Sequence, residues 1–377
     1  MLLPHAVAAD VLPPLTGSRL LTAWEIDPWL LAGLVVTAGL YLAGVVALRR
    51  RGVAWPVSRV VAFVVGGLGT VAIATLSSIA AYDDTLFTAH MTQHMILAMV
   101  SPVFLALGAP VTLLLRVSNR GIRHRVVAVL HSRVARFVTA PPVAWAHFVA
   151  LPFVLYNTGW YEATLRNATL HEWLHVQFLA AGCLFFWPLL GLDPMPRRLA
   201  YPARLLMVFL TLPAHAILGL SIMIQHHVIA RDYYAALGRT WGPTLSADQN
   251  MGGGVLWASG DLVGLLFFGV LFFQWQRADD RTARRDDRRL ARVQAGAAWR
   301  VAAQPAAADV GSGGAAGSAA SGAAGGAAGG AAGGEAGGAA GEDREPVLVR
   351  PWWEVDPGPL AERMRREGWQ RSDQRDD

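Results

Sequence analysis

The stretch FTAHMTQHMILAMVSPVFLALGAPVTLL, residues 87–114, decides the fold of this chain. It contains no aspartate, glutamate, lysine or arginine, and it is longer than the roughly 20 apolar residues that an α-helix needs to cross a bilayer. Pro102 and Pro110 interrupt it, and prolines at such positions kink or tilt a helix. The stretch therefore predicts a membrane-spanning helix that is not straight.

The rest of the chain has the same apolar character. Of its 377 residues, 54% are hydrophobic and only 16% are charged, which is typical of a polytopic membrane protein and not of a soluble enzyme. Seven stretches predict membrane-spanning helices, at residues 29–48, 60–81, 87–114, 138–157, 170–190, 204–226 and 253–275. We therefore expect an all-α membrane protein, a multi-pass seven-transmembrane helix bundle.

The placement of arginines predicts how this bundle is oriented. Thirteen arginines occupy the connections after the first, third and fifth spans, whereas four occupy the N-terminal segment and the other connections between spans. Because cytoplasmic loops carry the excess of basic residues, the N-terminus should lie outside and the C-terminus in the cytoplasm. This asymmetry accounts for the formal net charge of +5 without a nucleic-acid partner.

Composition divides the chain into five parts. Residues 1–28 form an external N-terminal segment, and residues 29–276 form the seven-span membrane domain. The arginine-rich residues 277–301 predict a basic juxtamembrane helix on the inner headgroup surface. Residues 302–344 are an Ala/Gly-rich linker, and residues 345–377 are a cytoplasmic tail. We expect this C-terminal tail region to be disordered.

Two short strings inside the spans carry candidate chemistry. His90-Met-Thr-Gln-His94 and His171-Glu-Trp-Leu-His175 each place two imidazoles on one helical face, about 6 Å apart along the helix axis. In the predicted orientation both pairs lie near the outer face, where His226 ends another span. Ionisable side chains within spans usually mark functional sites. We therefore predict one shared metal site formed by His90, His94, His171, His175 and His226.

Nearby sulfur and carboxylate groups bear on which metal is bound. Met91 and Met95 are neighbours of the histidines, and a thioether beside imidazoles favours copper, especially Cu(I), whereas zinc would accept the histidines alone. Methionines in spans are more often packing residues than ligands. Asp83 and Asp84 form an acidic external connection that would concentrate cations at the mouth of the site.

Other interpretations of the histidines remain open. The string His171-Glu172-Trp-Leu-His175 matches the H-E-x-x-H signature of zinc proteases, so an intramembrane zinc protease is a lesser alternative. Asp193 would have to be its third ligand, but it falls about 27 Å from His175 at the other end of the helix. The four-residue spacing does not fit two stacked haems, which need ligands half a membrane apart on each helix. A single haem is not excluded by this spacing.

A copper transport or tolerance protein is the main alternative function. It would need a polar path from the outer histidines past His215 and Asp261 to the inner side, and few polar groups follow that path in the sequence. His215 and Asp261 could instead line a deeper cavity, relay protons or simply be packed core groups. Transport is therefore the less favoured function.

Taken in order, these motifs resemble the polytopic, multi-span family of bacterial cytochrome c oxidase assembly factors, CtaG. The matching stretches are His90-Met-Thr-Gln-His94 through Leu107-Gly-Ala-Pro-Val-Thr112, His171–His175, Gly182–Pro188, Asp193-Pro-Met-Pro-Arg-Arg198, Asp248-Gln249, Gly252-Gly253-Gly254, Trp257 and Gly260. The chain is most similar to the actinobacterial branch, whose members often carry a fused copper-resistance membrane domain. We expect this chain to be the assembly-factor half alone.

The resemblance implies a function for the metal site. It implies an accessory factor, not an enzyme, that sits in the bacterial cell membrane and helps to mature haem–copper cytochrome c oxidase. Copper would be bound transiently and delivered to the oxidase. The implied partners are cytochrome c oxidase subunits or other copper chaperones, besides the lipid bilayer.

Overall fold

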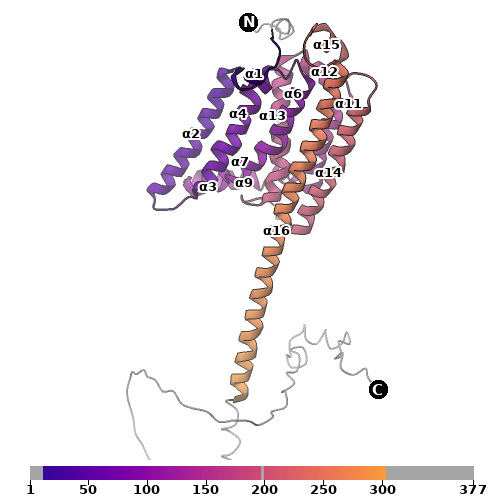
Figure 1. Ribbon diagram of the computed structural model, residues 1–377. Coiled ribbons are helices and arrows are strands. Elements are labelled where there is room, and N and C mark those ends of the chain that lie inside the picture. The colour runs from indigo at the N-terminus through magenta and orange to yellow at the C-terminus, as the bar shows by residue number, and fades with distance from the viewer. Residues whose placement is uncertain (1–11, 197–198, 303–377) are drawn as a thin grey trace, which may run out of the picture. The chain divides into compact units, whose positions relative to one another are not determined.

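The computed structural model describes residues 12–196 and 199–302, and every regular element in this part of the chain is a helix (Figure 1). The predicted all-α class is therefore confirmed. The Ala/Gly-rich linker and the tail predicted for residues 303–377 lie outside the described residues.

Six stretches of the described chain are long and apolar enough to cross a membrane. They are α2 (Pro28–Arg50), the α3–α5 stretch (Val57–Ala81), the α6–α8 stretch (Phe87–Val117), α13 (Ala168–Leu190), α14 (Tyr201–Ile224) and the part of α16 (Leu245–Ala302) up to Ala295. A short helix, α1 (Gly17–Thr22), precedes them, and the connections between them contain α9 (Arg120–Leu130), α10 (Arg133–Val138), α12 (Trp160–Leu165) and α15 (Arg231–Ala236).

The helix predicted as the fourth span is shorter than the other spans. It is α11 (Pro141–Asn157), whose 17 residues extend over about 26 Å at 1.5 Å per residue. Phe148, Leu151 and Leu155 place it in the main apolar core, where it packs against α13 and α14. The described part of the chain thus has six stretches that meet the length of a span, against the seven predicted, and α11 is the predicted span that falls short of it.

Two of the spanning stretches are built from several segments. The first comprises α3 (Val57–Val61), η2 (Ala62–Leu68), α4 (Gly69–Leu76) and α5 (Ser78–Ala81), and the second comprises α6 (Phe87–Met95), η3 (Ile96–Val100), α7 (Ser101–Leu107) and α8 (Pro110–Val117). Both η segments are π-helical turns, which insert one residue per turn and bend the helix.

The bends of the second stretch fall where its prolines predict them. The π-helical turn η3 lies directly before Pro102, which has no N–H to continue the helical ladder. The chain turns again at Ala109, whose φ is 48°, before Pro110 opens α8. Residues 87–107 alone extend over about 31 Å, enough for a hydrocarbon core of about 30 Å. The predicted kink is confirmed, and the turn at Ala109 separates α8 from the helix before it.

Small residues allow the central helices to approach closely. A Cβ added at Gly182 of α13 would collide with the carbonyl oxygen of Ala98 in η3. A Cβ at Gly253 of α16 would lie 2.9 Å from the carbonyl oxygen of Gly219 in α14. Helices in membranes gain their packing energy from such close backbone contact. These contacts hold α6–α7 against α13 and α14 against α16, and so fix where their side chains meet.

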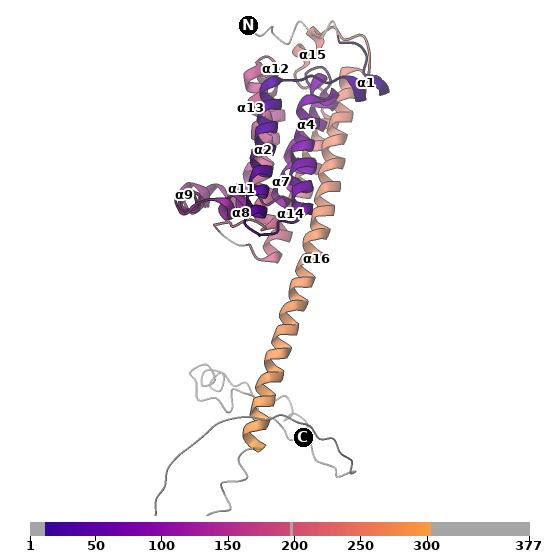
Figure 2. The ribbon, with the colours of Figure 1, turned by 90° about the vertical axis from the view of Figure 1, so that its left-hand side faces the viewer.

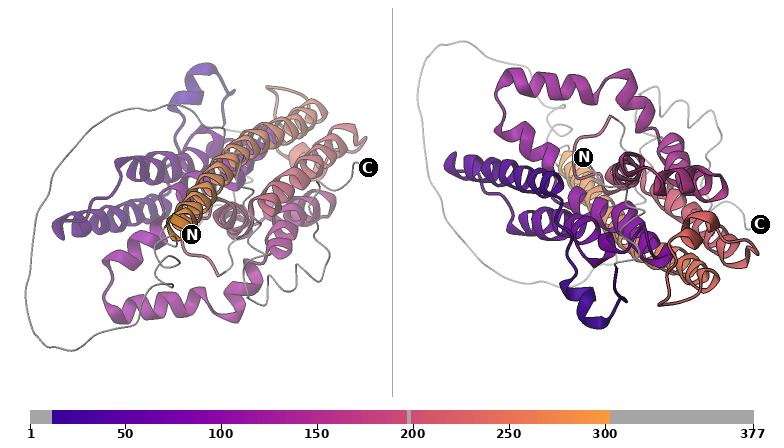
Figure 3. Two further views of the ribbon diagram at one scale, coloured as in Figure 1. Left: turned by 90° about the horizontal axis from the view of Figure 1, so that it is seen from below. Right: turned by 90° about the horizontal axis from the view of Figure 1, so that it is seen from above.

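The two ends of the bundle carry different elements. At the upper end in Figure 1 lie α1, α12 and α15, where α6, α13 and α16 begin and α14 ends. At the lower end lie α3 and α9, and Figure 3 shows the magenta α9–α10 segment at the periphery. These two short helices contain five arginines, Arg120, Arg123, Arg125, Arg133 and Arg136.

The last helix, α16, continues past its apolar part without a break (Figure 2). Side chains from residue 279 to residue 295 are all exposed. The basic helix predicted for residues 277–301 is therefore helical, as a direct continuation of the last span. Its position on a headgroup surface stays a prediction.

Candidate metal centre

Four histidines from two helices meet at the upper end of the bundle. The ring centroids of His90 and His94 on α6 are 3.8 Å apart, and those of His171 and His175 on α13 are 4.7 Å apart. Across the two helices, His90 lies 5.5 Å from His171, and His94 lies 5.9 Å from His175. The two strings therefore form one group, which we call the four-histidine cluster.

A carboxylate completes this cluster. Oδ2 of Asp83, in the loop before α6, lies 3.2 Å from Nε2 of His171 and 3.6 Å from Nε2 of His175. The ligand atoms of these three residues all lie within 4.8 Å of one another. A tetrahedral metal with bonds of about 2.1 Å separates its ligand atoms by about 3.4 Å, so this spacing suits a bound ion.

Asp83 remains ionised in its buried position. Burial alone would raise the pKa of its carboxyl, but the attraction of His171 and His175 and the hydrogen bond with His171 outweigh burial and hold that pKa below its usual value. A carboxylate beside an imidazole either ligates the metal itself or fixes the orientation of the ring. The sequence analysis assigned Asp83 only the attraction of cations and not a place in the site. Its position shortly before the helix that carries the first histidine pair was the sequence signal that could have placed it there.

Several ring nitrogens of the cluster are buried without a hydrogen-bond partner. Within the described part of the chain they are both nitrogens of His90, Nε2 of His94 and both nitrogens of His175, although the His175 nitrogens face the carboxylates of Asp83 and Glu172 at 3.6 and 3.5 Å. The other nitrogen of His94, Nδ1, lies 2.9 Å from the hydroxyl of Tyr156. A buried polar atom without a partner costs about 1–3 kcal/mol, so such atoms call for an explanation. Imidazole nitrogens gathered in one place with open lone pairs fit a metal site.

Exposure changes across the cluster. The side chains of His171, His175 and Asp83 retain slight access to solvent, whereas His90 and His94 are 0% and 2% exposed. The half-exposed carboxylate of Glu172 lies 3.5 Å from Nδ1 of His175. A cation arriving from the upper end would therefore meet carboxylates first, then the α13 histidines, and the α6 histidines last.

The start of α16 fixes the position of the α6 histidines. Asp248 accepts hydrogen bonds from the backbone N–H groups of Phe87 and Thr88, at 3.0 and 3.1 Å, and from the Thr88 hydroxyl at 2.6 Å. It thus caps α6 from another helix, a stabilising position for a carboxylate. Its side chain also lies 3.5 Å from the buried guanidinium of Arg239. The Asp248 side chain therefore sets where the first histidine pair begins.

Glycines that follow Asp248 in the sequence let α16 pack closely against its neighbouring helices. A Cβ at Gly252 would lie 2.5 Å from the ring of Phe87 and 3.2 Å from the side chain of Met91. Gly253 contacts α14, whereas nothing lies within 4 Å of a Cβ at Gly254. The first two members of this glycine run therefore allow close helix approach.

Two residues considered from the sequence lie away from the cluster. His226 is exposed, because α14 ends at Ile224 and the chain leaves in an extended conformation. The cluster therefore has histidines from two helices and not three, and its geometry gives no support to His226 as a ligand. Asp193 accepts from the backbone N–H of Thr112 at 2.7 Å and from the Trp187 indole at 2.9 Å, near the start of α8. As predicted, Asp193 is no third ligand for His171 and His175.

These features define a polytopic helical membrane protein with a buried histidine–carboxylate cluster. The family described as cytochrome c oxidase caa3 assembly factor, Caa3_CtaG, matches residues 39–278, and the chain belongs to this family. The match includes both histidine pairs, Asp83, Asp193 and Asp248.

Mycobacterial proteins without an assigned function are similar to the chain. Uncharacterised proteins of Mycobacterium bovis and Mycobacterium tuberculosis are each 39% identical over 282 residues, which is 73% of this chain and 42% of theirs. One from Mycobacterium leprae is 35% identical over 277 residues, 72% of this chain and 42% of its own. The chain thus spans less than half the length of these relatives. No solved structure matches it.

Proposed function

We propose that the protein binds copper at the four-histidine cluster and assists the maturation of cytochrome c oxidase without chemical turnover. The observation that carries this proposal is the set of buried imidazole nitrogens without partners beside an ionised Asp83. Imidazole nitrogens are good copper ligands, and membership of an oxidase assembly family supplies a use for bound copper.

Copper is cargo in this proposal and not a resident cofactor. His171 and His175, at the more accessible edge, would take the ion first, and His90 and His94 would complete its coordination. Exchange needs ligands that bind firmly and still release, which suits flexible imidazoles better than a closed set of thiolates. The receiving partner is a cytochrome c oxidase subunit or another copper chaperone.

The topology that we propose has seven spans with the N-terminus outside. In it α11 is the fourth span along the chain and brings the total to seven, since 17 residues is at the short end of the range for spanning helices and α11 packs within the main core. The arginine-rich α9 and α10 lie at the end opposite to the cluster, which supports a cytoplasmic lower end. The cluster then faces the outside of the bacterial plasma membrane.

Metal binding is tested with purified full-length protein and two matched double variants. We expect His171→Ala/His175→Ala to lower copper affinity by more than about 100-fold, beyond the effect of losing an outer-shell partner. His226→Ala/His227→Ala is the control, because it also removes two histidines at the same end, both exposed. Unchanged copper affinity in the first variant would refute the site.

The role in assembly is tested separately in cells. A deletion strain is complemented with the wild-type gene or with either double variant, and oxidase activity and the oxidase haem spectrum are measured. We expect only the His171→Ala/His175→Ala variant to fail to restore active oxidase. A deletion strain with normal oxidase would exclude the assembly role, whatever the metal result.

A further inference from the structure

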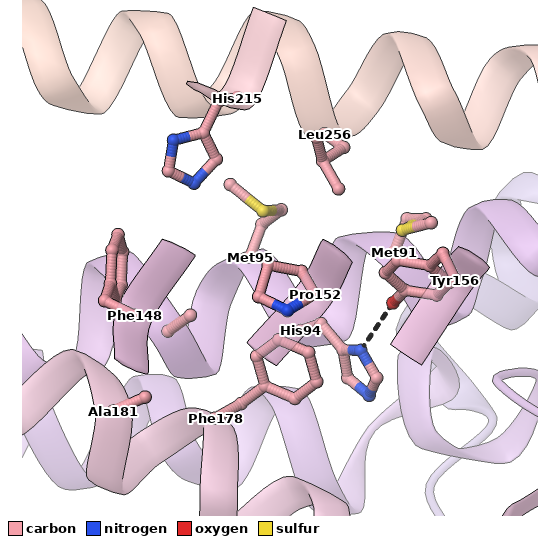
Figure 4. Close-up of a pocket in the computed structure, with 11 residues that line it drawn as sticks. Met91, His94, Met95, Phe148, Pro152, Tyr156, Phe178, Ala181, His215 and Leu256 are labelled. Atoms are coloured by element: carbon pink, nitrogen blue, oxygen red, sulfur yellow. Dashed lines mark hydrogen bonds between the residues drawn. The ribbon is translucent and has the colours of Figure 1, made fainter. Parts of the chain in front are cut away.

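A small cavity lies on the inward side of the four-histidine cluster. Its volume is about 20 Å³, which is room for one water-sized particle or one ion. Figure 4 shows the side chains that surround it, among them Met91 and Met95 of α6, His215 of α14 and Phe148 of α11. His94 also lines it, so one histidine borders both the cluster and the cavity.

The hydrogen bonding of His215 leaves one ring nitrogen open. Nδ1 lies 3.0 Å from the backbone carbonyl oxygen of Thr211. A carbonyl oxygen only accepts hydrogen bonds, so Nδ1 must carry the hydrogen, and Nε2 of the neutral ring has a free lone pair. Within the described residues Nε2 has no hydrogen-bond partner. A histidine fixed in this way through one nitrogen is oriented to bind a metal through the other.

The fold holds this histidine in one place. A Cβ at Gly260 of α16 would lie 2.9 Å from Cγ of His215, so the ring packs directly on the glycine. On another side the Phe148 ring lies with its centroid 5.7 Å away. His215 itself is 7% exposed. Figure 4 shows its ring and the sulfur of Met95 on the same side of the cavity.

We propose that Met95 and His215 form a second metal site, specific for Cu(I), on the inward side of the cluster. This inference rests on the proposed function, in which copper first binds the cluster. Thioether sulfur is a soft ligand that binds Cu(I) well and Zn²⁺ poorly, whereas the imidazoles and the carboxylate of the cluster accept either metal. The inner site would therefore select copper after the cluster has captured a cation.

Charge supports the same selectivity. No carboxylate lines the cavity, whereas Asp83 supplies a negative charge to the cluster. The cost of burying an ion in an apolar surrounding rises with the square of its charge, so an uncharged site admits a monovalent ion far more readily than a divalent one. Cu(I) is the monovalent ion whose preferred ligands are thioether and imidazole.

The site is tested on the full purified chain, kept reduced under anaerobic conditions. Bound Cu(I) is measured by competition with a chromogenic Cu(I) chelator, and copper–sulfur coordination by X-ray absorption. We expect wild type to hold about two equivalents of Cu(I), one at the cluster and one at the inner site. A sulfur ligand should be detectable on the copper at the inner site. Met95→Leu/His215→Gln should hold about one equivalent without copper–sulfur coordination.

Two further variants separate this inference from the proposed function. Met223→Leu, a methionine outside the cavity lining, is the matched control and should behave as wild type. His171→Ala/His175→Ala should lose the cluster copper and keep the sulfur-coordinated ion. Equal Zn²⁺ binding by wild type and Met95→Leu/His215→Gln will show that the variant is folded.

The possible failures are distinct. Wild type without copper–sulfur coordination, or with coordination that survives Met95→Leu/His215→Gln, refutes the inner site and leaves the cluster and the proposed function standing. Loss of sulfur-coordinated copper in Met223→Leu would refute the assignment of the ligands. Sulfur-coordinated copper as the sole ion bound by wild type refutes the cluster and supports the inner site.

Discussion

Two buried polar residues at opposite ends of the bundle, Asp193 and His90, differ in whether their polar atoms have hydrogen-bond partners. At the lower end, Asp193 accepts hydrogen bonds from the N–H and the hydroxyl of Thr112 and from the Trp187 indole, at 2.6–2.9 Å. At the upper end, His90 has two ring nitrogens and neither has a partner. Both residues belong to the matched family region, and both are buried.

The difference separates structural groups from functional ones. A satisfied buried carboxylate that caps a helix stabilises the fold. An unsatisfied buried imidazole costs stability, and it persists where a ligand or a reaction needs it. The motif around Asp193 therefore belongs to the architecture, and the motif around His90 belongs to the site. Three variants test this division, from the largest expected effect to the smallest.

Removing the satisfied carboxylate should have the largest effect on stability and none on metal binding. Asp193→Ala leaves the start of α8 uncapped and strands the Trp187 indole, so we expect a loss of about 3 kcal/mol in the free energy of unfolding. Thermal melts in detergent measure stability, and copper titration measures affinity. A fall in copper affinity without a fall in stability would show that Asp193 serves metal binding and not the fold.

Asp83 lies in the site and still has partners, so its removal should have an intermediate effect. We expect Asp83→Asn to lower stability at neutral pH by about 2 kcal/mol, because a charge-assisted hydrogen bond to His171 is lost. Copper affinity should fall as well. Glu172→Gln, which changes a half-exposed carboxylate beside the same histidines, is the control and should change stability little.

The effect of Asp83→Asn should also depend on pH. The folded pKa of Asp83 is below its unfolded value, so its stabilisation is fully present above the unfolded pKa of about 3.9 and is lost as pH falls below it. The gap between the melting curves of the two proteins should therefore narrow as the pH falls below about 4. A gap that widens in acid would contradict the ionised state of Asp83.

Removing an unsatisfied histidine should have the smallest effect on stability, and the opposite sign. His90→Leu replaces two buried nitrogens without partners by carbon at similar volume, so we expect the metal-free protein to gain about 1 kcal/mol. The same variant should lose copper affinity. Destabilisation by His90→Leu would show that His90 serves packing.

Much of the fold followed from local patterns in the chain. Apolar length predicted most of the long helices to within a few residues, as for α13 (Ala168–Leu190) against the predicted 170–190, whereas α16 begins at Leu245, eight residues before the predicted last span. Pro102 and Pro110 predicted the bends beside them, because a missing N–H acts locally. The four-residue spacing of the histidines predicted that each pair shares a face, because helical periodicity is a local property.

Contacts between helices could not be predicted in this way. Asp248 caps α6 although it lies 161 residues after Phe87 in the sequence. No local sequence pattern predicts a contact between residues so far apart. His226 was expected to join the site because its span ends at the same face, but α14 ends two residues earlier and the chain turns outward. Histidines at the same depth in the membrane need not point toward the same site, because depth does not fix the direction of a side chain.

The sequence by itself determined the helical membrane class, the spans and the two histidine pairs, because hydrophobic length and helical periodicity act within a single helix. The arginine pattern also placed both pairs at one end and Asp193 at the other, as the structure confirms. Only the tertiary structure decided that Asp83 joins the histidines while His226 does not, that Asp193 caps α8, and that His215 and Met95 share a cavity. These outcomes depend on how closely helices approach one another. Single glycines such as Gly182 and Gly260 set that approach through backbone contact.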